Sequence, residues 1–281
     1  MHIFDTLGES PVAESPSGLS RRSFFQKASV AGAAGAATLI GLVHSAPGYS
    51  QSGFTASDVD IIVAAEMAEA LAVTTYTTIV RTSSWFTRLP DDDQGYLYAA
   101  RNEEMSHYNL AKAGSGADSP YTTFYYPKHM FTDAKVTLNT LVALEDAFIA
   151  AYLLGVRNFS TADLRVTSAR IMGIESDHRT LARSLAGDVA PQDGGPIAKI
   201  TGLQGVAENV RPPNNNGYER TMCWSGIQQA VTALLPFVNK AHATAAGFDT
   251  SKPRTFEPFT PHLATPLGDF ISFTGCAAPS D

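Results

Sequence analysis

One pattern of glutamates, tyrosines and histidines occurs twice in this chain and constrains its fold more than any other feature. Each copy has a glutamate, a tyrosine seven residues later, and then a Glu-x-x-His motif. The copies are Glu69, Tyr76, Glu104 and His107, and then Glu145, Tyr152, Glu175 and His178. Residues three apart on a helix share one face, so each motif can direct a carboxylate and an imidazole toward one point. The pattern therefore favours helices that bring these side chains together.

Apolar residues recur at helical spacing through four stretches that contain these motifs. The expected helices cover residues 57–84, 90–114, 132–157 and 160–187. Four long helices joined by short to moderate connections are typical of an antiparallel bundle and not of a sheet protein. We therefore predict an all-α fold built on a four-helix bundle.

The C-terminal part of the chain is less regular. Residues 188–217 are rich in Gly, Pro and Asn and are expected to form a loop. Residues 218–246 are expected to form an added fifth helix despite Pro236. From residue 247 onward, repeated prolines predict an extended tail whose phenylalanines could pack on the bundle.

The N-terminal residues differ in kind from the rest. Arg21 and Arg22 precede a Gly- and Ala-rich apolar stretch over residues 28–43. This layout resembles a twin-arginine signal peptide, which implies export of the folded protein by the twin-arginine translocase to the periplasm or the cell exterior. The expected organisation is a signal at 1–50, the bundle at 51–187, and the loop, helix and tail at 188–281.

Composition limits the classes of partner and the number of large domains. A chain of 281 residues with 44% apolar content can bury one sizeable core. A net charge of −7 without a basic face gives no support for nucleic-acid binding. The two cysteines, Cys223 and Cys276, lie in the part expected to be exported, where either a disulfide or two unpaired thiols fits their spacing.

The repeated glutamates are hard to explain as packing alone. Four carboxylates that face one another inside a bundle repel, and burying them unpaired costs several kcal/mol each. Two divalent cations cancel the four negative charges. Glu69 and Glu145 could each bind one ion, and the Glu of each Glu-x-x-His motif could bridge the two ions. Oxygen-rich ligands with one imidazole per ion favour iron or manganese.

Other polar residues near these positions receive different interpretations. Glu66 competes with Glu69, but only Glu69 has a tyrosine at the same offset as Glu145. We expect Tyr76 and Tyr152 to pack behind the ligands. Glu103, Asp146 and Asp177 neighbour the ligands on other faces and are expected to meet solvent or to support the ligands. Three other histidines have no carboxylate at metal-ligand spacing and are expected to be surface or ordinary core residues: His129, His242 and His262.

Together these motifs resemble the ferritin-like superfamily, in particular the exported ferritin-like domain proteins related to desiccation-related proteins, and the ligand spacing is similar to that of rubrerythrin. The resemblance covers residues 57–187 and implies a dinuclear iron or manganese centre that reacts with oxygen or peroxide. It implies that the metal ligands are Glu69, Glu104, His107, Glu145, Glu175 and His178, with the four glutamates as the catalytic residues. The chain lacks the four cysteines of a rubredoxin-like module.

Two functions of different classes follow from these expectations. The first is an oxidoreductase of the ferroxidase, peroxidase or catalase kind, with oxygen, peroxide or ferrous ion as its small substrate. The second is a stress- or desiccation-associated protein whose two metals stabilise the bundle without turnover. A homo-oligomer is compatible with either function.

Overall fold

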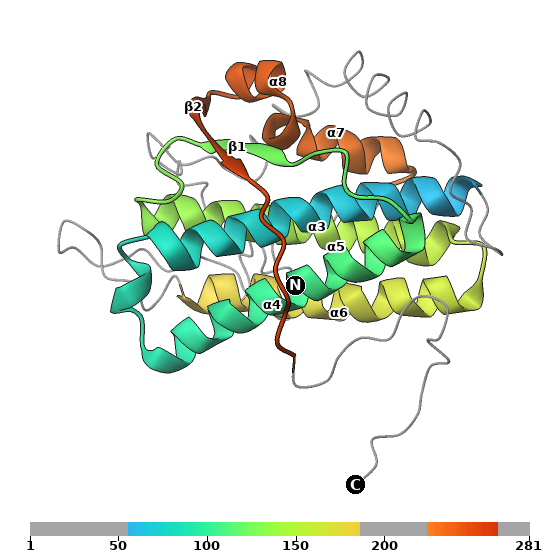
Figure 1. Cartoon of the computed structure of the whole chain (residues 1–281), viewed down its shortest axis with the longest axis horizontal. Coiled ribbons are helices and arrows are strands. Elements are labelled where there is room, and N and C mark those ends of the chain that lie inside the picture. The colour runs from blue at the N-terminus through green and yellow to red at the C-terminus, as the bar shows by residue number, and fades with distance from the viewer. Residues whose placement is uncertain (1–55, 186–223, 264–281) are drawn as a thin grey trace, which may run out of the picture.

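Four long helices form the body of the protein (Figure 1). The computed structural model describes residues 56–185 and 224–263. The helices are α3 (Ala56–Thr82), α4 (Asp91–Ser115), α5 (Ala134–Asn158) and α6 (Ala162–Leu185). α3 packs along α4, and α5 packs along α6, so that two antiparallel helix pairs make up the bundle. The predicted all-α bundle is confirmed, and a short 3₁₀ turn, Phe86–Arg88, joins the first pair.

Local sequence signals explain where these helices begin and end. Three aspartates, at positions 91–93, occupy the first turn of α4, where their negative charges interact favourably with the positive end of the helix dipole. Gly116 ends that helix with a φ of 74°, a left-handed conformation that glycine adopts without strain. Asp133 caps α5, because its carboxylate accepts hydrogen bonds from the backbone N–H groups of Lys135 and Val136.

α5 is the central helix of the bundle, and most of its residues are buried. Among the described helices, it is the one long and apolar enough to cross a membrane. In its most apolar window, 78% of the residues are buried inside the protein, which is what a core helix requires.

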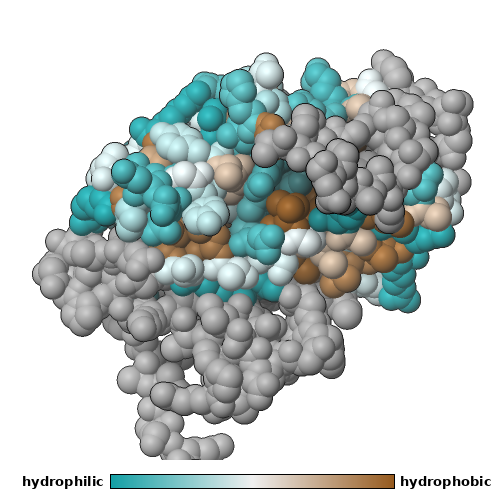
Figure 2. All heavy atoms as spheres, turned by 90° about the horizontal axis from the view of Figure 1, so that it is seen from below, coloured by the Kyte–Doolittle hydropathy of each residue, from teal (hydrophilic) through white to brown (hydrophobic). Residues whose placement is uncertain are grey.

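Seen from below (Figure 2), the bundle presents hydrophilic residues around a band of hydrophobic ones.

A second layer of shorter elements covers α3 and α5 on the opposite side (Figure 1). It consists of α7 (Ile227–Val238), α8 (Lys240–Ala245), β1 (Thr123–Pro127) and β2 (Phe248–Thr255). The prediction of one continuous helix up to residue 246 was wrong, because α7 ends at Asn239. Asn239 is extended, and its side chain caps α8 through the N–H groups of Ala241 and His242. Pro236 lies in the last turn of α7 and weakens that turn, because it has no N–H to donate to the carbonyl four residues earlier.

The expected extended tail is in part a β-strand. β2 pairs antiparallel with β1, with Thr123 opposite Thr255 and Pro127 opposite Phe248. The register shifts between these ends, and Pro253 lies in the irregular stretch, where it removes no regular ladder hydrogen bond. After the strand, the chain runs down across the bundle (Figure 1), and the Arg101 guanidinium lies 3.7 Å above the ring of Phe259.

Several predictions lie outside the described residues. They concern the signal at residues 1–50, the loop at 188–217, the start of the fifth helix, the pairing of Cys223 with Cys276, and the packing of Phe270 and Phe273.

Gly155 allows α5 and α6 to approach closely at one end of the bundle. A Cβ atom at this position would collide with the hydroxyl of Ser168 and would lie 2.9 Å from the ring of Phe159. By contrast, a Cβ at Gly173, on the exposed side of α6, would meet nothing within 4 Å. The two glycines therefore stand in opposite packing environments within the same helix pair.

We predict that Gly155→Ala lowers the free energy of unfolding by about 1–3 kcal/mol, because the added methyl overpacks the α5/α6 contact. Gly173→Ala is the matched control and should raise it by about 0.5–1 kcal/mol, because alanine restricts the unfolded chain and favours helix. Urea denaturation of both variants measures the difference. Equal effects of the same sign would contradict this account of the helix packing.

Candidate metal centre

The structure brings all six predicted ligand residues together in the middle of the bundle. Each of the four long helices contributes: Glu69 from α3, Glu104 and His107 from α4, Glu145 from α5, and Glu175 and His178 from α6. Their side chains are buried, and none is more than 3% exposed. Two sets of ligand atoms can be drawn among them, each within 4.8 Å of one another, and both sets include Glu104 and Glu175.

The first set surrounds the Nδ1 atom of His107. This nitrogen lies 3.3 Å from a carboxylate oxygen of Glu175, 3.5 Å from Glu104 and 3.7 Å from Glu69. Two ligand atoms that each lie about 2.1 Å from one ion, at right angles, are about 3 Å apart. The observed separations are close to that value, so these atoms could share one cation.

The second set surrounds the Nδ1 atom of His178. This nitrogen lies 2.9 Å from an oxygen of Glu104 and 3.3 Å from an oxygen of Glu175. Glu145 completes the set from the opposite side, α5. The two sets are related as the two copies of the sequence pattern are, so the repeated pattern is also a repeated geometry.

The unsatisfied atoms at this centre fit a pair of cations. Most of the buried carboxylate oxygens and both Nδ1 atoms have no hydrogen-bond partner with proper geometry. They belong to Glu69, Glu104, His107, Glu145, Glu175 and His178. Buried polar atoms are almost always satisfied in native proteins, so a cluster of this size calls for a ligand. The donors are oxygens and imidazole nitrogens, which suit iron and manganese.

Without cations, the electrostatics of the centre are strained. Burial, together with the neighbouring carboxylates, raises the pKa of Glu69 and of Glu145 well above the usual range. Burial by itself would lower the pKa of His107, but the nearby carboxylates of Glu104, Glu175 and Glu69 raise it well above normal. The bundle therefore demands positive charge at this point, either as protons or as metal ions.

The two tyrosines support the ligands across the bundle. Tyr76, on α3, donates a hydrogen bond of 2.7 Å to Glu145 on α5. Tyr152, on α5, donates in the same way to Glu69 on α3. Each tyrosine thus holds the glutamate of the other copy and leaves one oxygen of that carboxylate facing the centre. Repetition in the sequence predicts the two roles, but only the structure shows that they cross over.

Glu103 supports one histidine and has no counterpart on the other. Its carboxylate lies 2.8 Å from the Nε2 atom of His178, so the ring can direct Nδ1 to the centre. The equivalent position before Glu175 is Ile174, which offers no acceptor to His107. The side chain of Glu103 is 37% exposed, and it connects the His178 side of the centre to solvent.

Other candidates from the sequence lie apart from the centre. Asp146 was expected to meet solvent or to support a ligand, and it is instead buried against Arg179 on α6, 2.9 Å away. Asp177 is exposed, as expected. Within residues 56–185 and 224–263, the three other histidines belong to neither ligand set, and they are His129, His242 and His262. No spacing rule indicates the Asp146–Arg179 pair, because its partners are far apart in sequence.

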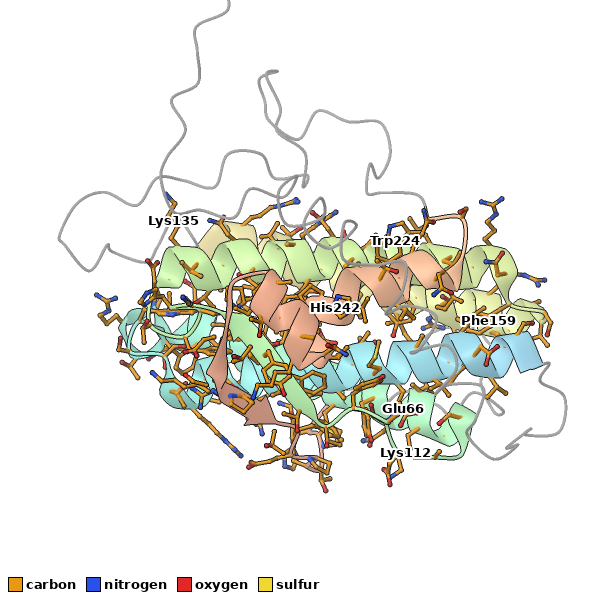
Figure 3. The ribbon with its side chains drawn as sticks, turned by 90° about the horizontal axis from the view of Figure 1, so that it is seen from above. Glu66, Lys112, Lys135, Phe159, Trp224 and His242 are labelled. Atoms are coloured by element: carbon orange, nitrogen blue, oxygen red, sulfur yellow. The ribbon has the colours of Figure 1, made fainter. Side chains whose placement is uncertain are left out.

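Glu66 is a buried carboxylate outside the centre, as its missing tyrosine partner predicts. It lies one turn before Glu69 and accepts a hydrogen bond of 2.8 Å from Ser115 on α4. Figure 3 shows Glu66 and Lys112 close together at one end of the bundle. Burial raises the pKa of Glu66 to about 7, and the Ser115 hydrogen bond offsets part of this rise.

Comparison with known proteins agrees with this geometry. A family model described as a ferritin-like domain matches residues 57–188, the stretch that forms α3 to α6. Neither the curated proteins nor the solved structures compared with this chain give a match. The match and the bundle together show that this segment folds as a ferritin-like helical domain, with buried glutamate and histidine groups that could hold metal ions.

We predict that Glu103→Ala weakens metal binding about 10–100-fold, because the His178 ring loses the acceptor that orients it. The control is Asp177→Ala, which removes an exposed carboxylate beside the same histidine and should leave the affinity unchanged. Competition with a metal-binding dye measures both affinities. If the two variants bound metal alike, Glu103 would have no orienting role.

We predict that Glu66 makes stability depend on pH. Unfolded Glu66 loses its proton near its ordinary pKa of 4.5, whereas the folded protein holds it up to about pH 7. The burial of this neutral group is therefore tolerated below pH 4.5, and stability falls as the pH rises to 7. Relative to wild type, Glu66→Gln should gain about 1–3 kcal/mol between pH 4 and pH 8. A difference that stays constant in urea unfolding across this range would contradict the shifted pKa.

Proposed function

We propose that this protein is a dinuclear metal protein with iron or manganese and that it reduces oxygen or peroxide. The observation that carries the proposal is the pair of buried ligand sets that share Glu104 and Glu175. Sharing of two carboxylates between adjacent sets is what a pair of bridged ions requires. A single structural ion would need only one set.

Each of the six side chains has a specific role in this proposal. Glu69 and His107 would hold one ion, Glu145 and His178 the other, and Glu104 and Glu175 would bridge them. When bound, a reduced metal pair supplies two electrons, which convert oxygen and two protons to hydrogen peroxide, or hydrogen peroxide and two protons to two water molecules. The four carboxylates balance the charge of two divalent ions, so the loaded centre is neutral before it reacts.

The rest of the chain protects and adjusts the centre. Burial of all six side chains excludes bulk water and strengthens the electrostatic interactions among them. Tyr76 and Tyr152 hold the two terminal glutamates in place through their hydroxyl groups. The Glu103 carboxylate is hydrogen-bonded to the Nε2 atom of His178, which leaves the Nδ1 atom of that ring free to hold a metal ion.

A second function is supported by the same charges. A metal pair that neutralises four buried carboxylates would stabilise the bundle even without turnover. In that case, the protein would be a metal-binding structural protein connected with stress or desiccation. Oxygen and peroxide consumption, measured with iron and separately with manganese, distinguishes the two functions.

Export remains part of the proposal. The arginine pair and the apolar stretch in residues 1–50 support passage through the twin-arginine translocase, which carries proteins that have already folded. A centre buried among four helices suits that route, because its metals would be inserted before transport.

We predict that replacing both bridging residues, Glu104→Gln with Glu175→Gln, lowers the metal content from two ions per chain to nearly none. Glutamine keeps the shape of the side chain but removes the charge that the cations balance. The matched control is Glu66→Gln, another buried glutamate, which should retain both metals. Metal analysis after purification and thermal melting with and without added metal measure the result.

Two metals retained in the double variant would remove the assignment of these ligands. So would a melting temperature that still rises on addition of metal. Two metals in the wild type without turnover of oxygen or peroxide would favour the structural function over the enzyme.

A further inference from the structure

We infer that the apolar cavity between α3, α5 and α7 takes up dioxygen and delivers it to the His107 side of the centre. The uptake depends only on the cavity, whereas the delivery rests on the function proposed above. Two neighbouring cavities, their lining, their sizes and their position relative to the ligands support the inference.

The larger cavity has a volume of about 30 Å³ and lies beneath the accessory helix α7. Its walls come from the alanine-rich face of α3, from α5 and from α7, which contacts both of these helices. Figure 3 looks down on α7, and Trp224 and Phe159 mark the end of the bundle where the cavity lies. Alanines such as Ala64 and Ala151 leave this space because their side chains are too small to fill it.

The smaller cavity has a volume of about 10 Å³ and reaches the centre itself. His107 and Tyr152 form part of its wall, together with apolar residues such as Ile62 and Ile171. His107 is a proposed ligand, and Tyr152 donates a hydrogen bond to the proposed ligand Glu69. A molecule in this cavity would therefore be next to the first ligand set.

The two cavities adjoin each other. Four residues line both of them: Ala65, Tyr152, Phe159 and Ser168. Ala65, on α3, has the smallest side chain of the four, so a larger residue at this position would fill the junction. Together the two cavities extend from the seam under α7 to the wall formed by His107 and Tyr152.

Size and polarity decide which molecule fits. A water-sized molecule needs roughly 10–15 Å³ on this scale, so the cavities suit a diatomic gas and not an acyl chain or a sugar. The hydroxyl of Ser168 donates to the backbone carbonyl of Tyr152, 2.8 Å away, and the hydroxyl of Tyr152 donates to Glu69. A water molecule would find few of the two to four partners that buried waters usually have, and apolar cavities of this kind bind apolar gases.

The opposite side of the centre has the opposite character. There His178 is hydrogen-bonded to Glu103, whose carboxylate is partly exposed to solvent. That side therefore has a polar contact with solvent, whereas the side toward α7 has an apolar cavity. This separation favours dioxygen over hydrogen peroxide as the molecule that uses the cavity, because peroxide is polar.

Nuclear magnetic resonance of the zinc-loaded protein under dioxygen pressure tests the uptake, because zinc is redox-inert and dioxygen is paramagnetic. We expect the buried methyl groups of Ala64, Ala68 and Ala147, which line the larger cavity, to relax faster than those of Ala100 and Ala182, which are buried away from it. Ala65→Leu should reduce the excess relaxation at Ala68 and Ala147, because the added side chain takes up space in the wall of the larger cavity. The matched control is Ala169→Leu, at a half-buried alanine of α6 that lines neither cavity, and it should retain the effect.

A second variant keeps the test valid if Ala65→Leu does not fold. Phe159→Leu enlarges both cavities and should increase the excess relaxation at the lining alanines. Equal relaxation of all buried alanines in the wild type would overturn the inference. So would an excess that Ala65→Leu leaves unchanged.

The iron-loaded protein separates this inference from the proposed function. Ala65→Leu should slow oxidation of the metals by dioxygen and leave oxidation by hydrogen peroxide unchanged. Unchanged oxidation by dioxygen would overturn the delivery role. If neither oxidant reacted with the wild type although the alanines relaxed faster, the proposed function would fail and gas uptake by the cavity would stand.

Discussion

The mutual repulsion of four carboxylates in the centre of the bundle is the constraint on which the rest of this structure depends. Each long helix contributes one of these glutamates, and none is more than 2% exposed to solvent. They are Glu69, Glu104, Glu145 and Glu175. Hydrophobic packing alone would not place them there, since each buried charge costs several kcal/mol without a counter-charge. In the function proposed above, a pair of divalent ions would supply that counter-charge, with the two imidazoles as neutral ligands. Burying these carboxylates costs the fold some intrinsic stability, which bound metal would restore in the function proposed above.

Much of the site was predictable because it depends on spacing along single helices. Glutamate and histidine three residues apart must share a face, and the repeated offset from Glu69 to Tyr76 and from Glu145 to Tyr152 distinguished Glu69 from Glu66. Contacts between distant segments were not predictable in this way. The pairing of β1 with β2 joins residues more than a hundred positions apart, and Pro253 hides the strand pattern. The end of α7 at Asn239 depends on a side-chain cap that competes with continued helix, and helical periodicity does not reveal such competition.

The two halves of the centre follow one plan but differ in their surroundings. On the His178 side, Glu103 orients the ring and extends to solvent. On the His107 side, Ile174 stands at the position equivalent to Glu103, His107 lines the smaller apolar cavity, and the larger cavity adjoins it under α7. The accessory helix thus does more than cover the bundle, because it closes the cavity over the α3/α5 seam. The two nearly symmetric halves thus differ in polarity, with a polar contact to solvent beside His178 and an apolar cavity beside His107.

Anomalous X-ray diffraction from crystals of the protein purified from its own host tests the central claim most directly. Data collected at the iron and manganese absorption edges identify each ion and locate it. The account predicts two ions between α3, α4, α5 and α6, one bound by the Nδ1 atom of His107 and the other by the Nδ1 atom of His178, with Glu104 and Glu175 touching both. A single ion, ions bound elsewhere, or a crystal of metal-reconstituted protein with no anomalous peak among these six side chains would contradict it.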